Sequence, residues 1–172
     1  MKIDTSKIII REAEPDDAEQ LLVYLKQVGG ESRNLTFGEE GLSYTLEQET
    51  NFLESLKNNP RAGIYLAIYD EEIIGNCSFD AYSNERLKHR ANFAISVKKA
   101  YWRHGIGSLL VEHILKKIKN LGCSLVTLEV LSENLPAIEL YKKFGFVKYG
   151  ELDSFFKIDG EHFPAVYMKL DI

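Results

Sequence analysis

A strand-like run followed by two glycines is the sequence feature that most restricts the fold. Apolar side chains alternate at Phe93, Ile95 and Val97, and a polar loop then leads to Gly105 and Gly107 at the start of an amphipathic helical pattern. Glycines at a helix N-terminus let consecutive backbone N–H groups converge on one point, where the helix dipole also favours negative charge. The segment therefore predicts a strand, a loop and a helix that together bind a phosphate group.

The rest of the chain alternates between strand-like and helix-like patterns. Strands are expected at residues 7–12, 64–69, 73–79, 90–97, 125–131, 146–156 and 163–170. Helices are expected from Pro15 to the pair Gly29 and Gly30, at residues 45–57, from Gly105 to Gly122, and at residues 136–144. The order β-α-α-β-β-β-α-β-α-β-β predicts an α+β fold with a mixed sheet, formed by residues 1–172 as a single domain.

Composition and charge disfavour several classes of protein. The 172 residues carry 21 basic and 26 acidic side chains, a net charge of −5 that does not favour a nucleic-acid-binding surface. The two cysteines, Cys77 and Cys123, lack metal-ligand spacing, so no metal site is expected. The apolar run at residues 8–10 is too short for a signal peptide or a membrane span. We therefore expect a cytoplasmic protein with reduced thiols and no membrane partner.

A second motif lies downstream of the glycine loop. Its residues are Asn134, Ala137, Leu140, Tyr141, Gly145 and Phe146. Together the two segments resemble the GCN5-related N-acetyltransferase (GNAT) family, whose acetyl donor is acetyl-CoA. The resemblance covers nearly the full length and implies the fold of that family, a mixed, mostly antiparallel twisted sheet flanked by helices. It also implies an acyltransferase that uses acetyl-CoA and no metal.

The resemblance assigns the donor site residue by residue. The glycine loop of the family reads Gln/Arg-x-x-Gly-x-Gly/Ala, and Trp102 departs from its first position. The strand before the loop would pair with the pantetheine arm like an added β-strand, and in the family it splays from its neighbour at a bulge. Donor contacts are thus expected from the loop residues Arg103, His104, Gly105, Ile106, Gly107 and Ser108, from the strand residues Ile95, Ser96 and Val97, and from Asn134, Ala137 and Tyr141.

Basic residues around the glycine loop agree with a phosphate site. The stretch 98–119 has one acid, Glu112, and six bases: Lys98, Lys99, Arg103, Lys116, Lys117 and Lys119. This excess of positive charge suits the phosphates of CoA. A solvated helix face explains the last three lysines equally well.

A dinucleotide-binding loop is the rival interpretation of the two glycines. In the motif Gly-x-Gly-x-x-Gly, Glu129 on the next strand would contact the ribose. The third glycine position is Leu110, however, and the loop from Val97 to Gly105 is longer than the tight turn of that motif. The chain also lacks a Gly-Lys-Ser/Thr sequence for a nucleoside triphosphate. These features disfavour nucleotide binding.

Acetyl transfer to an amine needs a base for the ammonium proton and an acid for the departing thiolate. Tyr141 occupies the position of the family's catalytic tyrosine and is the candidate acid; a tyrosine packed against the sheet is the alternative. Glu129 precedes a valine near the end of its strand and so resembles the glutamate that acts as base in ribosomal-protein alanine N-acetyltransferases. It is the candidate base. A structural carboxylate bonded to a neighbouring loop is its alternative. Other candidate bases are Asp80, His89 and Glu31.

Acidic residues cluster where the family holds its acceptor, between the loops after the first helices and the last hairpin. They are Glu31, Glu39, Glu40, Glu47, Glu49 and Glu54, and later Glu151, Asp153, Asp159 and Glu161. Such a surface would attract a cationic amine, either a small molecule, a polyamine, a lysine or a peptide N-terminus. We expect direct attack in a ternary complex. A non-catalytic CoA-binding regulatory module is the alternative, and a homodimer is left open.

Overall fold

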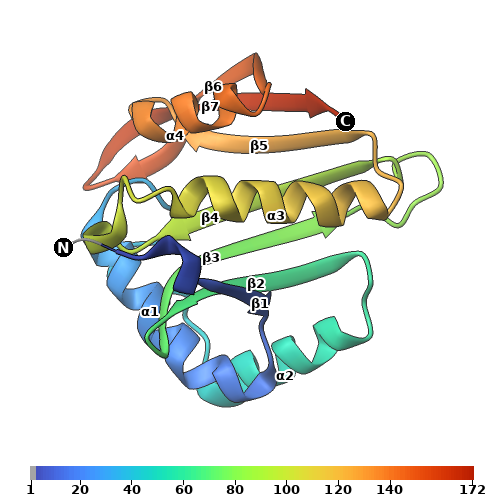
Figure 1. Cartoon of the computed structure of the whole chain (residues 1–172). Coiled ribbons are helices and arrows are strands. Elements are labelled where there is room, and N and C mark those ends of the chain that lie inside the picture. Colours follow the sequence, from blue (N-terminus) through green and yellow to red (C-terminus); the bar gives the residue numbers. More distant parts are fainter. Residues whose placement is uncertain (1–2) are drawn as a thin grey trace.

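The computed structural model describes residues 3–172, which form one seven-stranded sheet with helices on both faces (Figure 1). The strand order is β1-β2-β3-β4-β5-β7-β6, and neighbouring strands are antiparallel except for the parallel pair β4 and β5. The strands are β1 (Ile9–Glu12), β2 (Ala62–Tyr69), β3 (Glu72–Ala81), β4 (Arg90–Val97), β5 (Leu125–Leu131), β6 (Val147–Ile158) and β7 (Glu161–Asp171).

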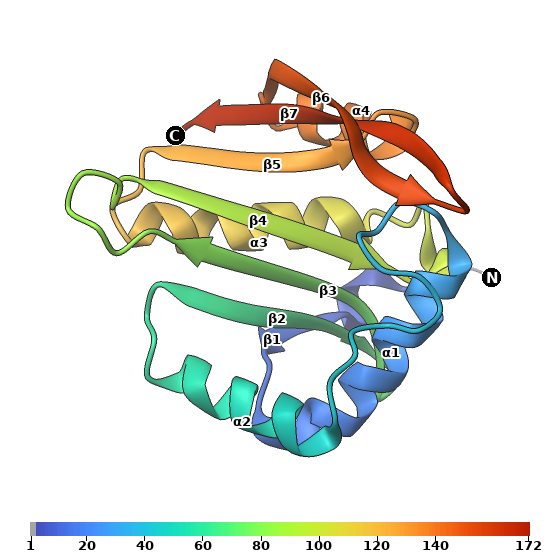
Figure 2. The ribbon, with the colours of Figure 1, turned by 180° about the vertical axis from the view of Figure 1, so that it is seen from behind.

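Four α-helices cover the two faces. They are α1 (Ala18–Glu31), α2 (Leu46–Lys57), α3 (Ile106–Asn120) and α4 (Leu135–Lys143), with short 3-10 turns at Thr5–Lys7, Pro15–Asp17 and Lys99–Tyr101. Helices α3 and α4 lie on one face, and α1 and α2 lie on the other (Figures 1 and 2). The larger core is buried under α3, whereas a second core fills the space between α1, α2 and strands β2 and β3. No helix among residues 3–172 is long and apolar enough to span a membrane.

The order of elements predicted from the sequence is confirmed, but the predicted end of the first helix is wrong. Helix α1 continues through Gly29 and Gly30 to Glu31. A Cβ atom on Gly29 would lie 1.9 Å from the carbonyl oxygen of Gly38. The glycine is therefore required by the close approach of the following loop to the helix, and it does not mark a helix end.

Strands β4 and β5 diverge after a short stretch of pairing. Their parallel register runs from Arg90 opposite Leu125 to Asn92 opposite Thr127, and the paired stretch ends there. The bulge that the resemblance implied is not found in β4, because its register with β3 runs without a shift across residues 91–97. The two strands therefore separate by divergence of regular strands, which leaves a gap near the middle of the sheet.

Candidate active site

The backbone of β4 offers unpaired hydrogen-bonding groups to this gap. In an antiparallel ladder every second residue directs its N–H and C=O groups to the same neighbour. Just past β4, the N–H of Lys98 donates to the carbonyl of Ile74 on β3 at 2.9 Å, so even-numbered residues face β3. The backbone groups of Ile95 and Val97 therefore face the gap. An extended ligand can pair with such an edge as a further strand does.

Ser96 differs from its two neighbours. Its backbone faces β3, and its hydroxyl lies 2.9 Å from the hydroxyl of Tyr24 on α1. Burial raises the pKa of Tyr24 well above its ordinary value, although the hydrogen bond with Ser96 opposes the shift. Ser96 thus joins β4 to α1, and the expected pairing of its backbone with a pantetheine arm is not what this geometry offers.

The N-terminus of α3 presents a second set of donors. Gly105 is the N-cap residue with φ of 82°, and the first helical bond runs from the N–H of Leu109 to its carbonyl at 3.1 Å. The N–H groups of Ile106, Gly107 and Ser108 therefore have no partner within the helix. Arg103 also has a positive φ, 63°, and alternating backbone conformations of this kind turn successive N–H groups toward one anion.

Gly107 brings the two motifs together. A Cβ atom at this position would lie 3.0 Å from Cδ2 of Leu140 on α4. The absence of a side chain therefore lets α4 pack against the first turn of α3. Open space surrounds the corresponding Cβ position of Gly105, where no atom lies within 4 Å. The first glycine thus leaves room for a ligand, and the second allows close packing.

Trp102 is a residue beside the candidate donor site whose contact the sequence interpretation did not find. Its indole N–H donates to the carbonyl of Val97 at 2.7 Å, and its ring remains 40% exposed. The indole therefore uses one of the carbonyls that face the gap as its hydrogen-bond acceptor. This bond fixes the glycine loop to the end of β4. The departure from the Gln/Arg position of the family was the available signal, but it did not reveal the bonding partner.

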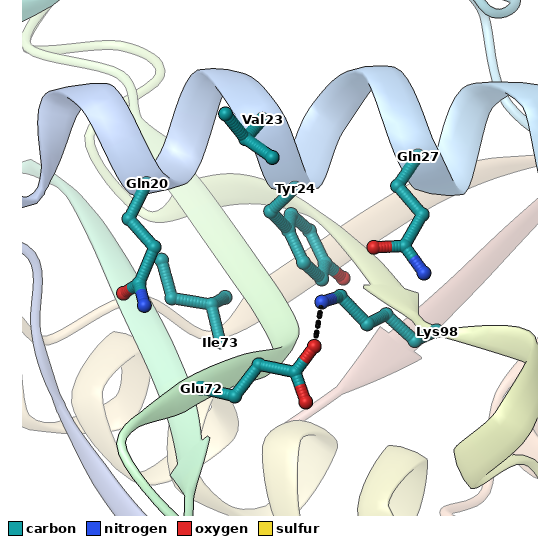
Figure 3. A pocket seen from close by; sticks show the side chains of 7 residues that line it. All are labelled: Gln20, Val23, Tyr24, Gln27, Glu72, Ile73 and Lys98. Carbon is teal, nitrogen blue, oxygen red and sulfur yellow. Dashed lines mark hydrogen bonds and ion pairs between the residues drawn. The ribbon is translucent and has the colours of Figure 1, made fainter.

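Lys98 does not belong to the basic patch around the glycine loop. Its side chain is buried beneath α1, where it forms an ion pair with Glu72 and lies 5.8 Å from the ring of Tyr24 (Figure 3). This pair and Tyr101, whose hydroxyl donates to Glu72 at 3.1 Å, tie β3 to the turn that precedes the glycine loop. The hydrogen bond from Lys98 lowers the pKa of the Glu72 carboxyl. The group lines a pocket of about 260 Å³ with Gln20, Val23, Tyr24, Gln27 and Ile73.

The lysines at the C-terminal end of α3 also have other contacts. Lys116 bonds to Glu112 at 2.8 Å, and Lys117 lies 5.2 Å from the ring of Tyr65. Ten helical residues separate Lys116 from Ile106, which corresponds to about 15 Å along the axis. Within the basic stretch, Lys99 and Arg103 are the residues adjacent to the glycine loop.

Helix α4 places Asn134 and Tyr141 beside the gap. The side chain of Asn134 accepts from the N–H of Ala137 at 3.3 Å, so its predicted role as N-cap is confirmed. Tyr141 is buried with its ring 5.9 Å from those of Phe93 on β4 and of Phe146. Burial raises the pKa of its hydroxyl, which therefore stays protonated at neutral pH. The hydroxyl has no hydrogen bond within residues 3–172.

The side chains of Leu128 and Val130 pack in the core under α3, so by alternation Glu129 points to the opposite face of the sheet. Helices α1 and α2 leave that face open over β5 (Figure 2). The N–H of Ser132, just past β5, donates to the carbonyl of Pro164 on β7 at 3.0 Å, so by alternation the backbone of Glu129 faces the gap. Its exposed carboxylate, beside Tyr167 of β7, forms no hydrogen bond or ion pair within the described chain. The alternative of a carboxylate bonded to a neighbouring loop is therefore not found.

The other candidate bases lie in less suitable places. Glu31 accepts from the N–H of Lys99 at 2.6 Å and so holds the turn before the glycine loop. His89 precedes β4 at the closed end of the β4–β5 pair, away from the gap. Asp80 is opposite Asn92, one strand further from the gap. Glu129 thus has the most direct access to the gap among these four residues.

Two segments border the open face as the resemblance implied. The guanidinium of Arg33, after α1, lies 4.5 Å from the ring of Phe163 in the β6–β7 hairpin. The expected negative surface is weaker than the count of acids suggests, because several have local roles. Glu40 accepts from the N–H of Gly38, Glu49 is buried with its pKa raised by desolvation, and Glu151 is paired with Lys148.

A sheet that opens at a parallel pair, with an anion site at one end and a capped helix beside it, defines a fold that binds an extended phosphate-bearing ligand. The profile of the acetyltransferase (GNAT) family matches residues 31–146, and the chain belongs to this family. It is therefore an N-acetyltransferase of the GNAT type, a family that uses acetyl-CoA.

Similar proteins agree with this assignment. The chain is 28% identical to the L-amino acid N-acetyltransferase AaaT of Escherichia coli over 95% of this chain and 97% of that protein. It is 31% identical to the ribosomal protein bS18-alanine N-acetyltransferase of Salmonella typhimurium, over 46% of this chain and 54% of that protein. A GNAT acetyltransferase structure from Streptococcus pneumoniae superposes with a TM-score of 0.91 and 30% identity, covering 96% of this chain and 99% of that chain.

Gly105→Asp tests the anion site at the start of α3. CoA at 100 times its Kd should stabilise the wild type by about 2.7 kcal/mol and raise Tm by about 5 to 10 °C. The aspartate variant should lose this shift because its carboxylate would occupy the open space next to the donor N–H groups. Gly105→Asn is the matched control, since asparagine has the same size and tolerates positive φ but carries no charge. An equal Tm shift in the aspartate variant and the wild type would contradict the site.

Proposed function

We propose that the chain, as a single domain, transfers an acetyl group from acetyl-CoA to a primary amine by direct attack in a ternary complex. The observation that carries this proposal is the gap between β4 and β5, with Tyr141 on the α4 side and Glu129 on the open side. Acid and base candidates thus approach one gap from opposite faces of the sheet. The amine and the thioester can meet there without a covalent acyl-enzyme.

The residues around the gap fit acetyl-CoA. The N–H groups at the start of α3 suit its pyrophosphate, and the backbone edge at Ile95 suits the amides of its pantetheine arm. Asn134 and Ala137, at the start of α4, would lie along that arm. When bound, acetyl-CoA supplies a thioester whose C–S bond breaks as the amine nitrogen forms the new C–N bond.

Each proton in this transfer has a proposed carrier. Glu129 accepts a proton from the ammonium group, directly or through water, so that a neutral amine is available. Tyr141, whose raised pKa keeps it protonated, gives its proton to the departing sulfur, and the second proton that the nitrogen loses as the amide forms restores the Tyr141 phenol. Unpaired backbone N–H groups that face the gap stabilise the negative charge on the carbonyl oxygen during the transfer.

The acceptor proposed here is an α-amino group. The similar proteins act, by their names, on an L-amino acid and on the alanine of a ribosomal protein, and both substrates present such a group. The partly neutralised acidic loops give less support to a polyamine than the sequence suggested.

Release of free CoA thiol in the presence of different amines tests the proposed function. We expect acetyl-CoA to be consumed with free amino acids or short peptides that have an unblocked N-terminus, and their N-acetylated forms to accumulate. N-blocked analogues of the same compounds are the control and should give no thiol. If CoA raises Tm but no amine releases thiol, the alternative of a non-catalytic CoA-binding module is favoured instead.

A further inference from the structure

Arg90, the first residue of β4, is a cation without a carboxylate partner on the open face of the sheet. Its Nε atom is buried and forms no hydrogen bond, and its side chain has no ion pair within residues 3–172. Asp80 is opposite Asn92, two residues along β4 on the same face, yet the side chains of Asp80 and Arg90 do not pair. The guanidinium instead lies 5.4 Å from the ring of Tyr82. A guanidinium that has no carboxylate partner can bind an anionic ligand through its N–H donors.

The Glu129 carboxylate lies on the same face as Arg90. Leu125 is opposite Arg90, and Glu129 follows four residues later on β5, a separation of about 13 Å along the strand. Both charges act on the hydroxyl of Tyr149, on β6. Burial raises the pKa of Tyr149, Glu129 raises it further, and Arg90 opposes the shift. An unpartnered anion and an unpartnered cation thus face one region of the sheet surface.

Aromatic rings border this region on the side of β6 and β7. The ring of Tyr167 is 5.9 Å from that of Tyr149 and 6.1 Å from that of Phe155. Tyr149 is 52% exposed and Phe155 is 37% exposed. Their exposed surfaces provide an apolar wall beside the two charges, which suits a ligand with an apolar side chain.

We propose that the acceptor is a free α-amino acid whose carboxylate is bound by Arg90 while its amino group faces Glu129. The proposal rests on the acetyltransferase function proposed above and selects between its two kinds of α-amino acceptor. A peptide N-terminus has an amide where the free amino acid has a carboxylate, so it leaves Arg90 unpaired. A polyamine would bring positive charge to Arg90.

Three amines of one shape test the role of Arg90: leucine, leucinamide and 3-methylbutylamine. We expect Arg90→Gln to lower kcat/KM for leucine by about 10- to 100-fold, the effect of losing a hydrogen-bonded charge. The values for leucinamide and 3-methylbutylamine should change by less than about threefold. Each amine is compared with itself in the two enzymes, so differences in amine pKa cancel. Arg90→Lys should retain part of the activity with leucine, because lysine keeps the positive charge but lacks the paired N–H donors of the guanidinium.

Two controls separate this role from a structural one. Arg86→Gln removes an exposed arginine from the loop that precedes β4 and should leave all three kcat/KM values unchanged. KM for acetyl-CoA should be unaltered in Arg90→Gln, whereas a distorted sheet would raise it. Equal losses for all three amines, or none for leucine, would overturn the proposal. Acetylation of a leucyl peptide but not of leucine would also overturn it and leave the acetyltransferase function intact. Release of CoA with none of these amines would contradict both.

Discussion

Tyr141→Phe is expected to lower kcat by about 100-fold while KM for acetyl-CoA changes by no more than a few-fold. The substitution removes the proposed proton donor for the departing sulfur and nothing else that the structure identifies. The Tyr141 hydroxyl has no hydrogen bond within the described chain, and the ring contacts with Phe93 and Phe146 remain available to phenylalanine. Tm should therefore stay close to that of the wild type.

The measurement is single-turnover acetyl transfer, which isolates chemistry from product release. Tyr65→Phe is the matched control, because Tyr65 is also buried under α3 with its pKa raised by burial to about 12, but lies on β2 away from the gap. It should leave the rate unchanged. Because burial places the pKa of Tyr141 above its ordinary value, the wild type should show no loss of rate from tyrosine ionisation up to about pH 10. An unchanged single-turnover rate in Tyr141→Phe would remove this residue from the mechanism.

The features predicted correctly from the sequence are those decided by nearby residues. Gly105 adopts a positive φ at the start of α3, and Asn134 caps α4 through a bond to a residue three positions away. Both depend on local backbone geometry that few residue types can adopt or satisfy. The alternation of apolar residues likewise predicts the strands on each side of the gap, because burial of one face imposes a period of two.

The features that the sequence could not supply depend on partners far along the chain. Gly29 has the residue type of a helix end, and its actual role follows from the approach of Gly38. Lys98 is adjacent in sequence to the candidate phosphate-binding loop, yet Glu72 on another strand holds it beneath α1. The absence of a partner for Arg90 is visible only when every neighbour has been placed.

The position of Glu129 depends both on nearby residues and on residues far along the chain. The sequence suggests a carboxylate surrounded by apolar residues, because Leu128 and Val130 flank it. The pleat of β5 separates them: the flanking side chains are buried in the core under α3, whereas the carboxylate is exposed on the other face. Its position beside the gap depends further on the divergence of β4 and β5, which no local pattern predicts.

Glu129→Gln is expected to lower kcat/KM for the amine by about 100-fold or more near neutral pH. Glutamine keeps the size of the side chain and part of its hydrogen bonding, but it cannot accept the ammonium proton. Because the carboxylate is exposed and unpartnered, the substitution should leave Tm nearly unchanged. Asp80→Asn is the comparison, since Asp80 lies on the same face one strand further from the gap, and it should retain the wild-type rate.

The pH dependence distinguishes a base from a carboxylate that only shapes the site. The α-amino group proposed as the acceptor is mostly protonated at pH 7, so in the proposed mechanism the wild type depends on Glu129 to remove the proton. As pH rises toward the pKa of the amine, a growing fraction of acceptor is already neutral, and the rate of Glu129→Gln should approach that of the wild type. A carboxylate that only positions the amine would give the same fold-loss at every pH. Profiles of kcat/KM that stay parallel from pH 6 to pH 10 would therefore exclude Glu129 as the base and transfer the assignment to Asp80, His89 or Glu31.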